Sequence, residues 1–234
     1  MQAIAPDVVC IQETKAQEHQ LPLEAAAVAH YHSAFHDAVK PGYSGVAIYA
    51  RRAPDRIVRG LGWPEYDAEA RYLQMDFGAL SIVSLYVPSG SSGYARQTVK
   101  AAFLKLFEGE LARMRADGRS YVVAGDFNVA HRDIDVFDPK RCSRISGFFP
   151  EDRAWMERVL QQGWVDGFRQ ADPNPKRYTW WSNFPRAFAN NLGWRIDYQL
   201  LTPDLRERVR GASIYTERRF SDHAPLVMDY DLDL

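Results

Sequence analysis

An apolar run ends in an acid and an amide in the stretch Tyr121-Val122-Val123-Ala124-Gly125-Asp126-Phe127-Asn128. Its first four residues are apolar and mostly β-branched or aromatic, which predicts a buried strand that breaks at Gly125. Side chains alternate along an extended segment, so Asp126 and Asn128 are expected to point to the same side. Because Gly, Asp and Asn are also the usual turn residues, a plain turn is the competing interpretation.

The composition is that of a globular protein without a global basic field. The 234 residues are 46% hydrophobic and 13% aromatic, and the formal net charge is -1, so binding to nucleic acid would need a local basic face or bound cations. Two cysteines, Cys10 and Cys142, are too few for a disulfide framework or a cysteine-based zinc site. There is no long apolar run and no charged-then-apolar leader pattern. We expect a soluble cytoplasmic protein that does not associate with membranes.

Strand patterns outnumber helix patterns. The residues predict helices at 21–30, 94–117 and 150–162, and polar loops at 129–147 and 172–193, the second with exposed aromatic residues. Strands are predicted at 8–12, 45–49, 71–77, 80–87, 121–124, 194–201, 213–217 and 224–230. The pair 71–77 and 80–87 has the pattern of a hairpin, which excludes an all-parallel sheet. We therefore predict one α/β (α+β) domain over residues 1–234, a four-layer α/β/β/α sandwich of two packed mixed sheets flanked by helices.

Polar side chains stand at the ends of four predicted strands. A further carboxylate, Asp197, lies inside the apolar strand 194–201, where it needs a partner, and a histidine is the natural one. Each residue alone has an ordinary interpretation as a helix start, a core residue or a turn cap. Their joint occurrence favours a functional site, made of Glu13, Tyr86, Asp126 with Asn128, and Asp222 with His223.

Oxygen ligands without cysteine suit magnesium or manganese, and Glu13 is the best first candidate for such a ligand. A divalent ion, a carboxylate that aligns water and a histidine that donates a hydrogen bond are together suited to cleaving a phosphodiester. The ion and the imidazole stabilise charge on the phosphoryl oxygens, and the carboxylate positions or deprotonates the nucleophile.

Five short motifs occur in an order that resembles exonuclease III, the bacterial apurinic/apyrimidinic (AP) endonuclease family of the endonuclease/exonuclease/phosphatase superfamily. They are Ile11–Lys15, Tyr86–Gly90, Gly125–Asn128, Gly193–Tyr198 and Ser221–Pro225. The resemblance extends from residue 5 to the end of the chain. It implies a DNA-repair phosphodiesterase that cleaves 5′ to abasic sites in double-stranded DNA and removes nucleotides from 3′ ends.

The resemblance also implies site roles. Catalysis is expected of Tyr86, Asp126, Asn128, Asp197 and His223. One or two Mg²⁺ ions, for which Mn²⁺ can substitute, are expected at Glu13, Asp126, Asn128, Asp222 and His223. Substrate contacts are expected from Trp180, Trp194, Ile196 and Arg144, the first three lining a pocket for a flipped-out abasic sugar. Core packing is the alternative interpretation of the two tryptophans.

Basic residues near the motifs would position a phosphate backbone without reading sequence, and an ordinary solvated surface is the alternative for most of them. They are Lys15, Arg96, Arg132, Lys140, Arg141, Arg144, Arg177, Arg186 and Arg195. Two other functions stay open: another phosphodiesterase or phosphatase of the same fold, acting for example on a phospholipid, and an inactive DNA-binding remnant. A monomer is expected.

Three features depart from the family pattern. The family's first strand, with its Asn-Val-Asn-Gly-like end, has no counterpart, so the chain is expected to be N-terminally truncated by about 20–30 residues, roughly a strand and a helix. Ile145 stands where an asparagine is common, and Ser89 stands where some relatives have asparagine or glutamine. Ile145 affects one polar loop contact and leaves the expected metal site unchanged, and Ser89 is expected to shift the balance of exonuclease activity in a direction that the sequence does not give.

Overall fold

The structure is a computed structural model that describes residues 4–234. The chain forms two compact units, each built from segments that are distant in sequence. Unit 1 comprises the chain up to Tyr86, Arg119–Gly125 and Asp233–Leu234, and unit 2 comprises Val87–Gly118 and Asp126–Leu232. The chain combines helices with several sheets, which confirms the predicted α/β class. The single domain over residues 1–234 stays a prediction.

Unit 1 contains a three-stranded antiparallel sheet in the order β1-β3-β2. Its strands are β1 (Val8–Gln12), β2 (His32–His36) and β3 (Val46–Ala50). All five residues of β3 are buried, as expected of a central strand with Ala47 opposite both Ile11 and Phe35. The predicted helix over 21–30 is shorter, because α1 (Leu23–Ala26) follows Pro22 and ends where the Ala26 carbonyl accepts a hydrogen bond from Ser33 Oγ.

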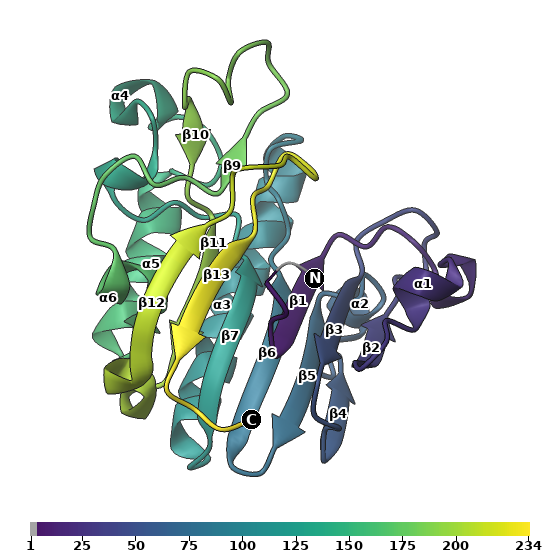
Figure 1. The fold of residues 1–234 in the computed structure, drawn as a ribbon. Helices are drawn as coiled ribbons and strands as arrows, with labels where there is room; N and C mark the ends of the chain where they lie inside the picture. The colour runs from purple at the N-terminus through teal and green to yellow at the C-terminus, as the bar shows by residue number, and fades with distance from the viewer. Residues whose placement is uncertain (1–3) are drawn as a thin grey trace. The chain divides into compact units, whose positions relative to one another are not determined.

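A second group of strands in unit 1 runs in the order β4-β5-β6-β7. These strands are β4 (Arg56–Arg59), β5 (Tyr72–Phe77), β6 (Leu80–Tyr86) and β7 (Ser120–Asp126), the last residue of which belongs to unit 2. The predicted hairpin is confirmed, since β5 and β6 pair antiparallel with Phe77 opposite Leu80. The two groups of strands are in contact (Figure 1), and Gln12 Nε2 donates to Ser84 Oγ at 2.8 Å. Unit 1 also has η1 (Glu18–Gln20) and α2 (Pro64–Asp67).

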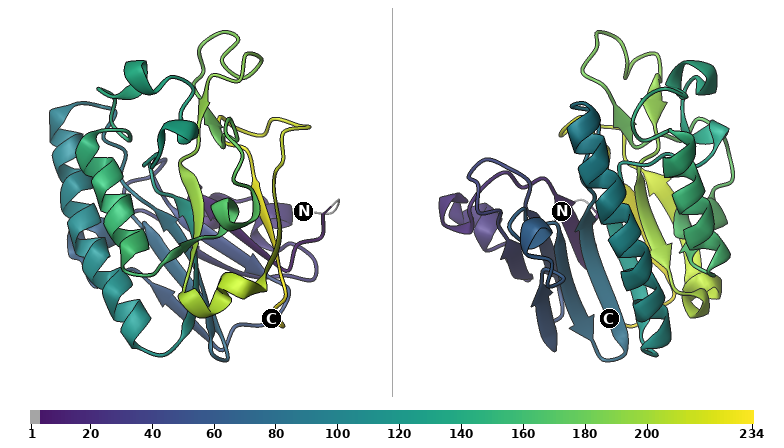
Figure 2. Two further views of the ribbon diagram at one scale, coloured as in Figure 1. Left: turned by 90° about the vertical axis from the view of Figure 1, so that its left-hand side faces the viewer. Right: turned by 180° about the vertical axis from the view of Figure 1, so that it is seen from behind.

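Two long helices of unit 2 lie side by side (Figure 2), α3 (Tyr94–Ala116) and α5 (Pro150–Gln161). Both confirm their predictions, and Trp155 Nε1 of α5 donates to Leu104 O of α3 at 2.8 Å. Leu106 lies outside the buried face of α3, since it is 46% exposed. The face is formed by Lys100, Phe103, Leu104, Phe107, Leu111 and Met114.

The remaining elements of unit 2 are short. The predicted polar loop 129–147 contains η2 (Asp133–Asp135) and α4 (Pro139–Cys142). Two antiparallel pairs are β8 (Val165–Asp166) with β11 (Asp197–Leu201) and β12 (Val209–Ile214) with β13 (Leu226–Tyr230), the second visible in yellow-green and yellow in Figure 1. α6 (Gly167–Ala171) packs against β11 and β12. The others are β9 (Trp180–Trp181), β10 (Gly193–Trp194) and η3 (Pro203–Arg208).

The strand predicted over 194–201 is in fact divided. β10 ends at Trp194 and β11 begins at Asp197, so Asp197 opens a strand and does not lie inside one. The intervening amides are bonded elsewhere: Arg195 N donates to Asp135 O, and Ile196 N donates to Thr179 Oγ1. The prediction that the aromatic residues of the loop 172–193 are exposed is also wrong in part, because Tyr178 and Trp181 are buried.

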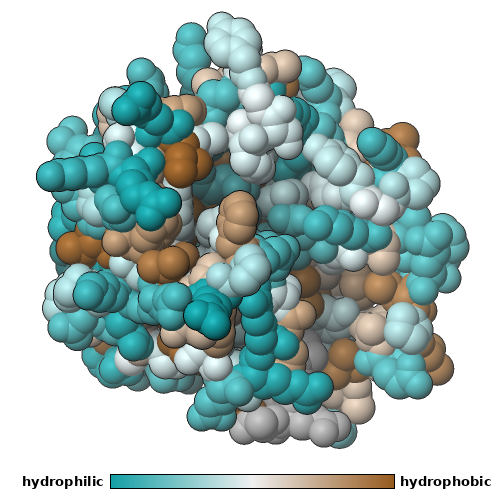
Figure 3. All heavy atoms as spheres, turned by 90° about the horizontal axis from the view of Figure 1, so that it is seen from above, coloured by the Kyte–Doolittle hydropathy of each residue, from teal (hydrophilic) through white to brown (hydrophobic). Residues whose placement is uncertain are grey.

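Within residues 4–234, no helix has the length and apolar character that crossing a membrane requires. Seen from above, hydrophilic residues cover most of the visible surface, and apolar residues form small separate patches (Figure 3).

Candidate active site

Asp126 and Asn128 hold each other at the end of β7. The strand can end this way because Gly125 faces the Leu85 backbone so closely that any Cβ would overlap with it. Asp126 is buried, and its Oδ1 accepts from Asn128 N at 2.8 Å while its Oδ2 accepts from Asn128 Nδ2 at 2.9 Å. The predicted orientation to one side is confirmed, although Asn128 reaches it in the left-handed region at φ 51° and not in an extended conformation.

Asp197 and His223 form the second half of the site. Phe127 N donates to Ile196 O at 2.9 Å, which brings the start of β11 beside the end of β7. His223 Nδ1 lies 3.1 and 3.0 Å from the two carboxylate oxygens of Asp197, as the sequence predicted for a histidine partner. The other ring nitrogen, Nε2, lies 4.0 Å from Asp126 Oδ2, which is beyond hydrogen-bond distance.

The charge state of His223 follows from these neighbours. Burial opposes protonation, but the Asp197 charge, its hydrogen bond to the ring, and the charges of Asp126 and Asp222 outweigh it and raise the pKa of His223 to about 10. The ring is therefore an imidazolium at neutral pH, with both nitrogens acting as donors. One donor is used by Asp197, and the other faces Asp126 across the gap.

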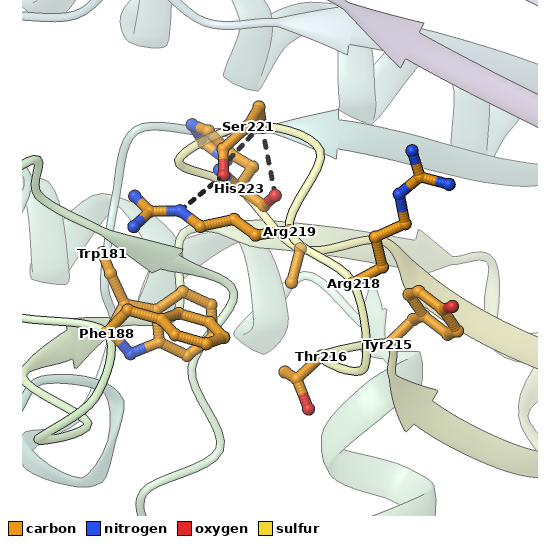
Figure 4. Close-up of a pocket in the computed structure, with 9 residues that line it drawn as sticks. Trp181, Phe188, Tyr215, Thr216, Arg218, Arg219, Ser221 and His223 are labelled. Carbon is orange, nitrogen blue, oxygen red and sulfur yellow. Dashed lines mark hydrogen bonds between the residues drawn. The ribbon is translucent and has the colours of Figure 1, made fainter.

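Hydrogen bonds within the turn hold Asp222 and His223 in place. His223 N donates to Ser221 Oγ at 2.9 Å, and Arg219 Nε donates to Ser221 O at 2.9 Å while its guanidinium lies over the Phe188 ring (Figure 4). The cavity that these residues line measures about 10 Å³, which admits at most one water. This side of His223 is therefore closely packed, and the packed residues support the turn.

The three residues predicted to line a sugar pocket come together. Trp194 and Ile196 are only 6% and 7% exposed and belong to one apolar cluster with Phe148, against which Trp180 packs. The Trp180 and Trp194 rings meet edge to face at 6.4 Å, and Trp180 Nε1 donates to Asp222 Oδ2 at 3.0 Å. Core packing therefore accounts for most of the Trp194 and Ile196 surface, and the half-buried Trp180 is the member that keeps an open face.

The other predicted site residues, Glu13 and Tyr86, lie in unit 1. Glu13 follows β1 with φ 55°, and its carboxylate pairs with Lys15 Nζ at 2.5 Å. Tyr86 is 9% exposed at the end of β6, and the buried Arg71 guanidinium lies over its ring at 4.7 Å and donates to its carbonyl oxygen at 3.1 Å. Glu13 directly follows the end of β1, and Tyr86 is the last residue of β6, so both stand at strand ends as the sequence predicted.

One predicted phosphate contact is wrong. Arg195 is 1% exposed and donates to Asp135 Oδ1 at 2.8 Å and to Asp166 Oδ2 at 2.7 Å. Its charge is therefore paired in the interior and does not face solvent. Arg169 completes this group by pairing with Asp135 Oδ1 at 2.6 Å. Arg144, by contrast, is exposed after α4 and available for a surface contact.

Sequence reasoning missed Lys100. This lysine is fully buried in α3, and its Nζ donates to Asn128 O at 2.8 Å. A signal was present, because position 100 precedes Phe103, Leu104 and Phe107 at the three- and four-residue steps of a buried helix face. A lysine in register with that face is a charged group that the core must accommodate.

Comparisons with known proteins agree on one family. The profile of the Endonuclease/Exonuclease/phosphatase family matches residues 1–223. An exodeoxyribonuclease of Bacillus subtilis (strain 168) is 33% identical over 94% of this chain and 86% of its own length, and the DNA repair nuclease APEX1 of Danio rerio is 33% identical over 95% and 73%. The structure of an AP endonuclease from Archaeoglobus fulgidus matches with a TM-score of 0.89 at 29% identity, over 99% of this chain and 91% of that one.

Proposed function

The chain belongs to the endonuclease/exonuclease/phosphatase family, and on that premise we propose that it is a metal-dependent DNA-repair phosphodiesterase. It hydrolyses the phosphodiester bond 5′ to abasic sites in double-stranded DNA and removes nucleotides from 3′ ends, leaving a 3′-hydroxyl. One observation carries the proposal: an imidazolium donor and a carboxylate acceptor, His223 Nε2 and Asp126 Oδ2, face each other 4.0 Å apart, beyond hydrogen-bond distance. That spacing suits two reacting groups, one that accepts a hydrogen bond from His223 and one that donates a hydrogen bond to Asp126.

The residues of unit 2 divide the work by charge. His223, held by Asp197, donates through Nε2 to a phosphoryl oxygen and stabilises the negative charge that grows there. Asp126 aligns the attacking water and takes its proton, and Asn128 fixes the carboxylate through two hydrogen bonds. For Tyr86 we propose contact with the same phosphate, on the strength of the family resemblance and its fixed ring.

The donor set fits a divalent cation with oxygen ligands. Asn128 Nδ2 donates to Asp126 Oδ2 and to Val87 O, so its amide oxygen remains as an acceptor beside a buried carboxylate. We propose that Mg²⁺ or Mn²⁺ is held by Glu13, Asp126, Asn128 and Asp222. When bound, the ion neutralises charge on the phosphoryl oxygens and helps to orient water. We assign His223, expected from the resemblance as a further ligand, to the phosphate, because Asp197 holds its Nδ1 and Nε2 is the nitrogen that faces the site.

DNA contacts are proposed for the loops of unit 2. The abasic sugar packs against Trp180, whose indole is set by Asp222 and whose neighbours Trp194 and Ile196 close the apolar wall behind it. Arg144 contacts a backbone phosphate. The free thiols of Cys10 and Cys142 suit a reducing compartment, so we propose a cytoplasmic monomer.

The test is cleavage of a duplex that carries one tetrahydrofuran abasic analogue, with Mg²⁺ and with excess chelator. The proposal expects a nick 5′ to the analogue only when Mg²⁺ is present, and shortening of 3′ ends in a second, unmodified duplex. Cleavage that persists in chelator, or hydrolysis of a phosphoinositide in place of DNA, would overturn it. Duplex binding that weakens with salt but gives no product would indicate a DNA-binding protein without catalytic activity.

A further inference from the structure

Lys100 is a charged side chain enclosed in the interior of unit 2. It is 0% exposed on the inner face of α3, and its Nζ lies 3.0 Å from Asp152 Oδ1 of α5. The same nitrogen donates to the backbone carbonyl of Asn128 at 2.8 Å. A second helix and the turn that follows Asp126 are therefore joined through one amine.

A buried ion pair of this kind contributes little net free energy to the stability of a core. Burial lowers the pKa of Lys100, and the Asp152 carboxylate opposes that shift by its charge and hydrogen bond. Apolar side chains of similar volume are often as stabilising as a buried pair, because they avoid the cost of removing charges from water. Stability alone thus gives little reason for a lysine at this position, and its contact with Asn128 becomes the informative one.

The Asn128 peptide is a part of the site that needs support. Its φ of 51° lies in the left-handed region, which costs free energy for a residue with a side chain. Its Nδ2 donates to Asp126 Oδ2 and to Val87 O, both at 2.9 Å. The side chain is thus fixed at one end, and the Lys100 amine fixes the carbonyl at the other.

Asp152 extends the same support to a third segment. Its Oδ2 accepts from Gly147 N at 2.8 Å, and Gly147 O accepts from Ala130 N at 2.7 Å. Gly147 has φ 97°, and a Cβ there would lie 2.9 Å from Asn128 O, so only glycine lets this backbone approach. The Asn128 carbonyl is consequently enclosed between the Lys100 amine and the Gly147 backbone.

We propose that Lys100 is a positioning residue for phosphodiester cleavage, which with Asp152 holds the Asn128 turn in the conformation that orients Asp126. The inference rests on the proposed function for its catalytic readout. Lys100 is enclosed behind the turn and acts through Asn128, so its role is to fix geometry and not to contact DNA.

The principal variant is Lys100→Met, which keeps an unbranched apolar side chain as far as Cε and removes the amine. We expect kcat on the abasic-analogue duplex to fall about 100-fold, the scale of a small misplacement of reacting groups, while KM changes by less than about twofold. Hydrogen exchange of the Ala130 amide should become at least 10-fold faster in Lys100→Met.

Two further variants separate positioning from stability. In Lys100→Met with Asp152→Asn the unpaired charge is gone and Gly147 N keeps an acceptor, so stability should recover while kcat stays low. Met114→Ala truncates a fully buried side chain at the far end of α3 and should lower stability without changing kcat. A merely structural Lys100 would instead recover kcat together with stability.

The outcomes distinguish this inference from the proposed function. If wild-type protein cleaves the duplex and Lys100→Met cleaves it equally well, the inference is overturned and the function stands. If wild-type protein does not cleave, the function fails, and the exchange rate of the Ala130 amide still decides whether Lys100 holds the turn. An unchanged exchange rate in Lys100→Met contradicts the inference in either case.

Discussion

Unit 2 contains two clusters of charged side chains that differ in two respects. The closed cluster, Asp135, Asp166, Arg169 and Arg195, pairs buried Asp135 with both guanidinium groups at 2.6 and 2.8 Å. The open cluster, Asp126, Asn128, Asp197 and His223, leaves an imidazolium nitrogen 4.0 Å from a carboxylate oxygen, with the His223 side chain 25% exposed. Both contain buried charge, so burial alone does not mark a functional site. The two clusters differ in the 4.0 Å spacing between an opposed donor and acceptor and in the partial exposure of His223.

The largest expected effect is on the chemistry of the open cluster. Asp126→Asn removes the proposed proton acceptor while keeping the size of the side chain, so kcat on the abasic-analogue duplex should fall about 10³–10⁴-fold. The unfolding free energy should fall by about 1–3 kcal/mol, since one of the two Asn128 donors, N or Nδ2, keeps an oxygen acceptor and the other loses its own. Steady-state kinetics and urea unfolding on the same preparation check both parts. A large stability loss with unchanged kcat would reverse the assignment of the two clusters.

The opposite behaviour is expected in the closed cluster. Arg195→Met leaves Asp135 and Asp166 facing a side chain without charge, which should lower the unfolding free energy by about 3–5 kcal/mol. Urea unfolding gives the value. Measured at a temperature where the variant is still folded, its kcat should stay within about fivefold of wild type. A loss of kcat as large as that of Asp126→Asn would show that the closed cluster takes part in catalysis.

The two clusters should also respond to opposite ends of the pH range. The folded-state pKa of His223 is raised from 6.5 to about 10, so its pairing with Asp197 contributes stability that is complete below about pH 6.5 and disappears as pH rises through 10. For Asp135, burial favours the neutral acid, but Arg195 and Arg169 outweigh it and hold the pKa at about 2. That contribution is complete above about pH 4 and lost as pH falls through 2.

Asp197→Asn tests the first of these windows. In chelator, the stability difference between wild type and Asp197→Asn should shrink steadily from pH 6 to pH 10, followed by urea unfolding at several pH values. We also expect kcat at neutral pH to fall about 100-fold, because His223 loses the partner that keeps it charged and oriented. A stability difference that is constant across this range would mean that His223 is not the titrating group.

The smallest effect is expected at the rim of the open cluster. Trp180→Phe keeps the aromatic face and removes the Nε1 hydrogen bond to Asp222, which should cost about fivefold in kcat/KM, or about 1 kcal/mol. Trp181→Phe is a matched control, since that indole bonds to Asn191 and is buried. Equal losses in the two variants would mean that general packing, and not the sugar-facing position, accounts for the effect.

The sequence located the open cluster because its residues stand at strand ends, where a turn residue and a catalytic residue follow the same strand pattern. It predicted the partnership of Asp197 with a histidine, although it placed Asp197 inside a strand. That error has a local cause, since the Thr179 hydroxyl accepts hydrogen bonds from the amides of Ile196 and Asp197. No residue pattern records a bond between segments so far apart.

The closed cluster and Lys100 show the limit of the same reasoning. Arg195 was expected to contact phosphate because its neighbours belong to a family motif, yet its charge is consumed by Asp135 and Asp166. Lys100 was not among the predicted site residues, although its spacing puts it on the buried face of α3. The sequence does not show which residue a charged side chain pairs with. That partner decides whether the charge contributes to stability or to catalysis.

The most direct test of the central claim is a double-mutant cycle of Asp126→Asn and His223→Ala, measured as kcat on the abasic-analogue duplex with Mg²⁺. If the two residues act on one reacting phosphate, His223→Ala costs about 10³-fold in wild type but less than about 10-fold in the Asp126→Asn background. A full 10³-fold loss in both backgrounds would contradict the claim that the open cluster is one catalytic unit.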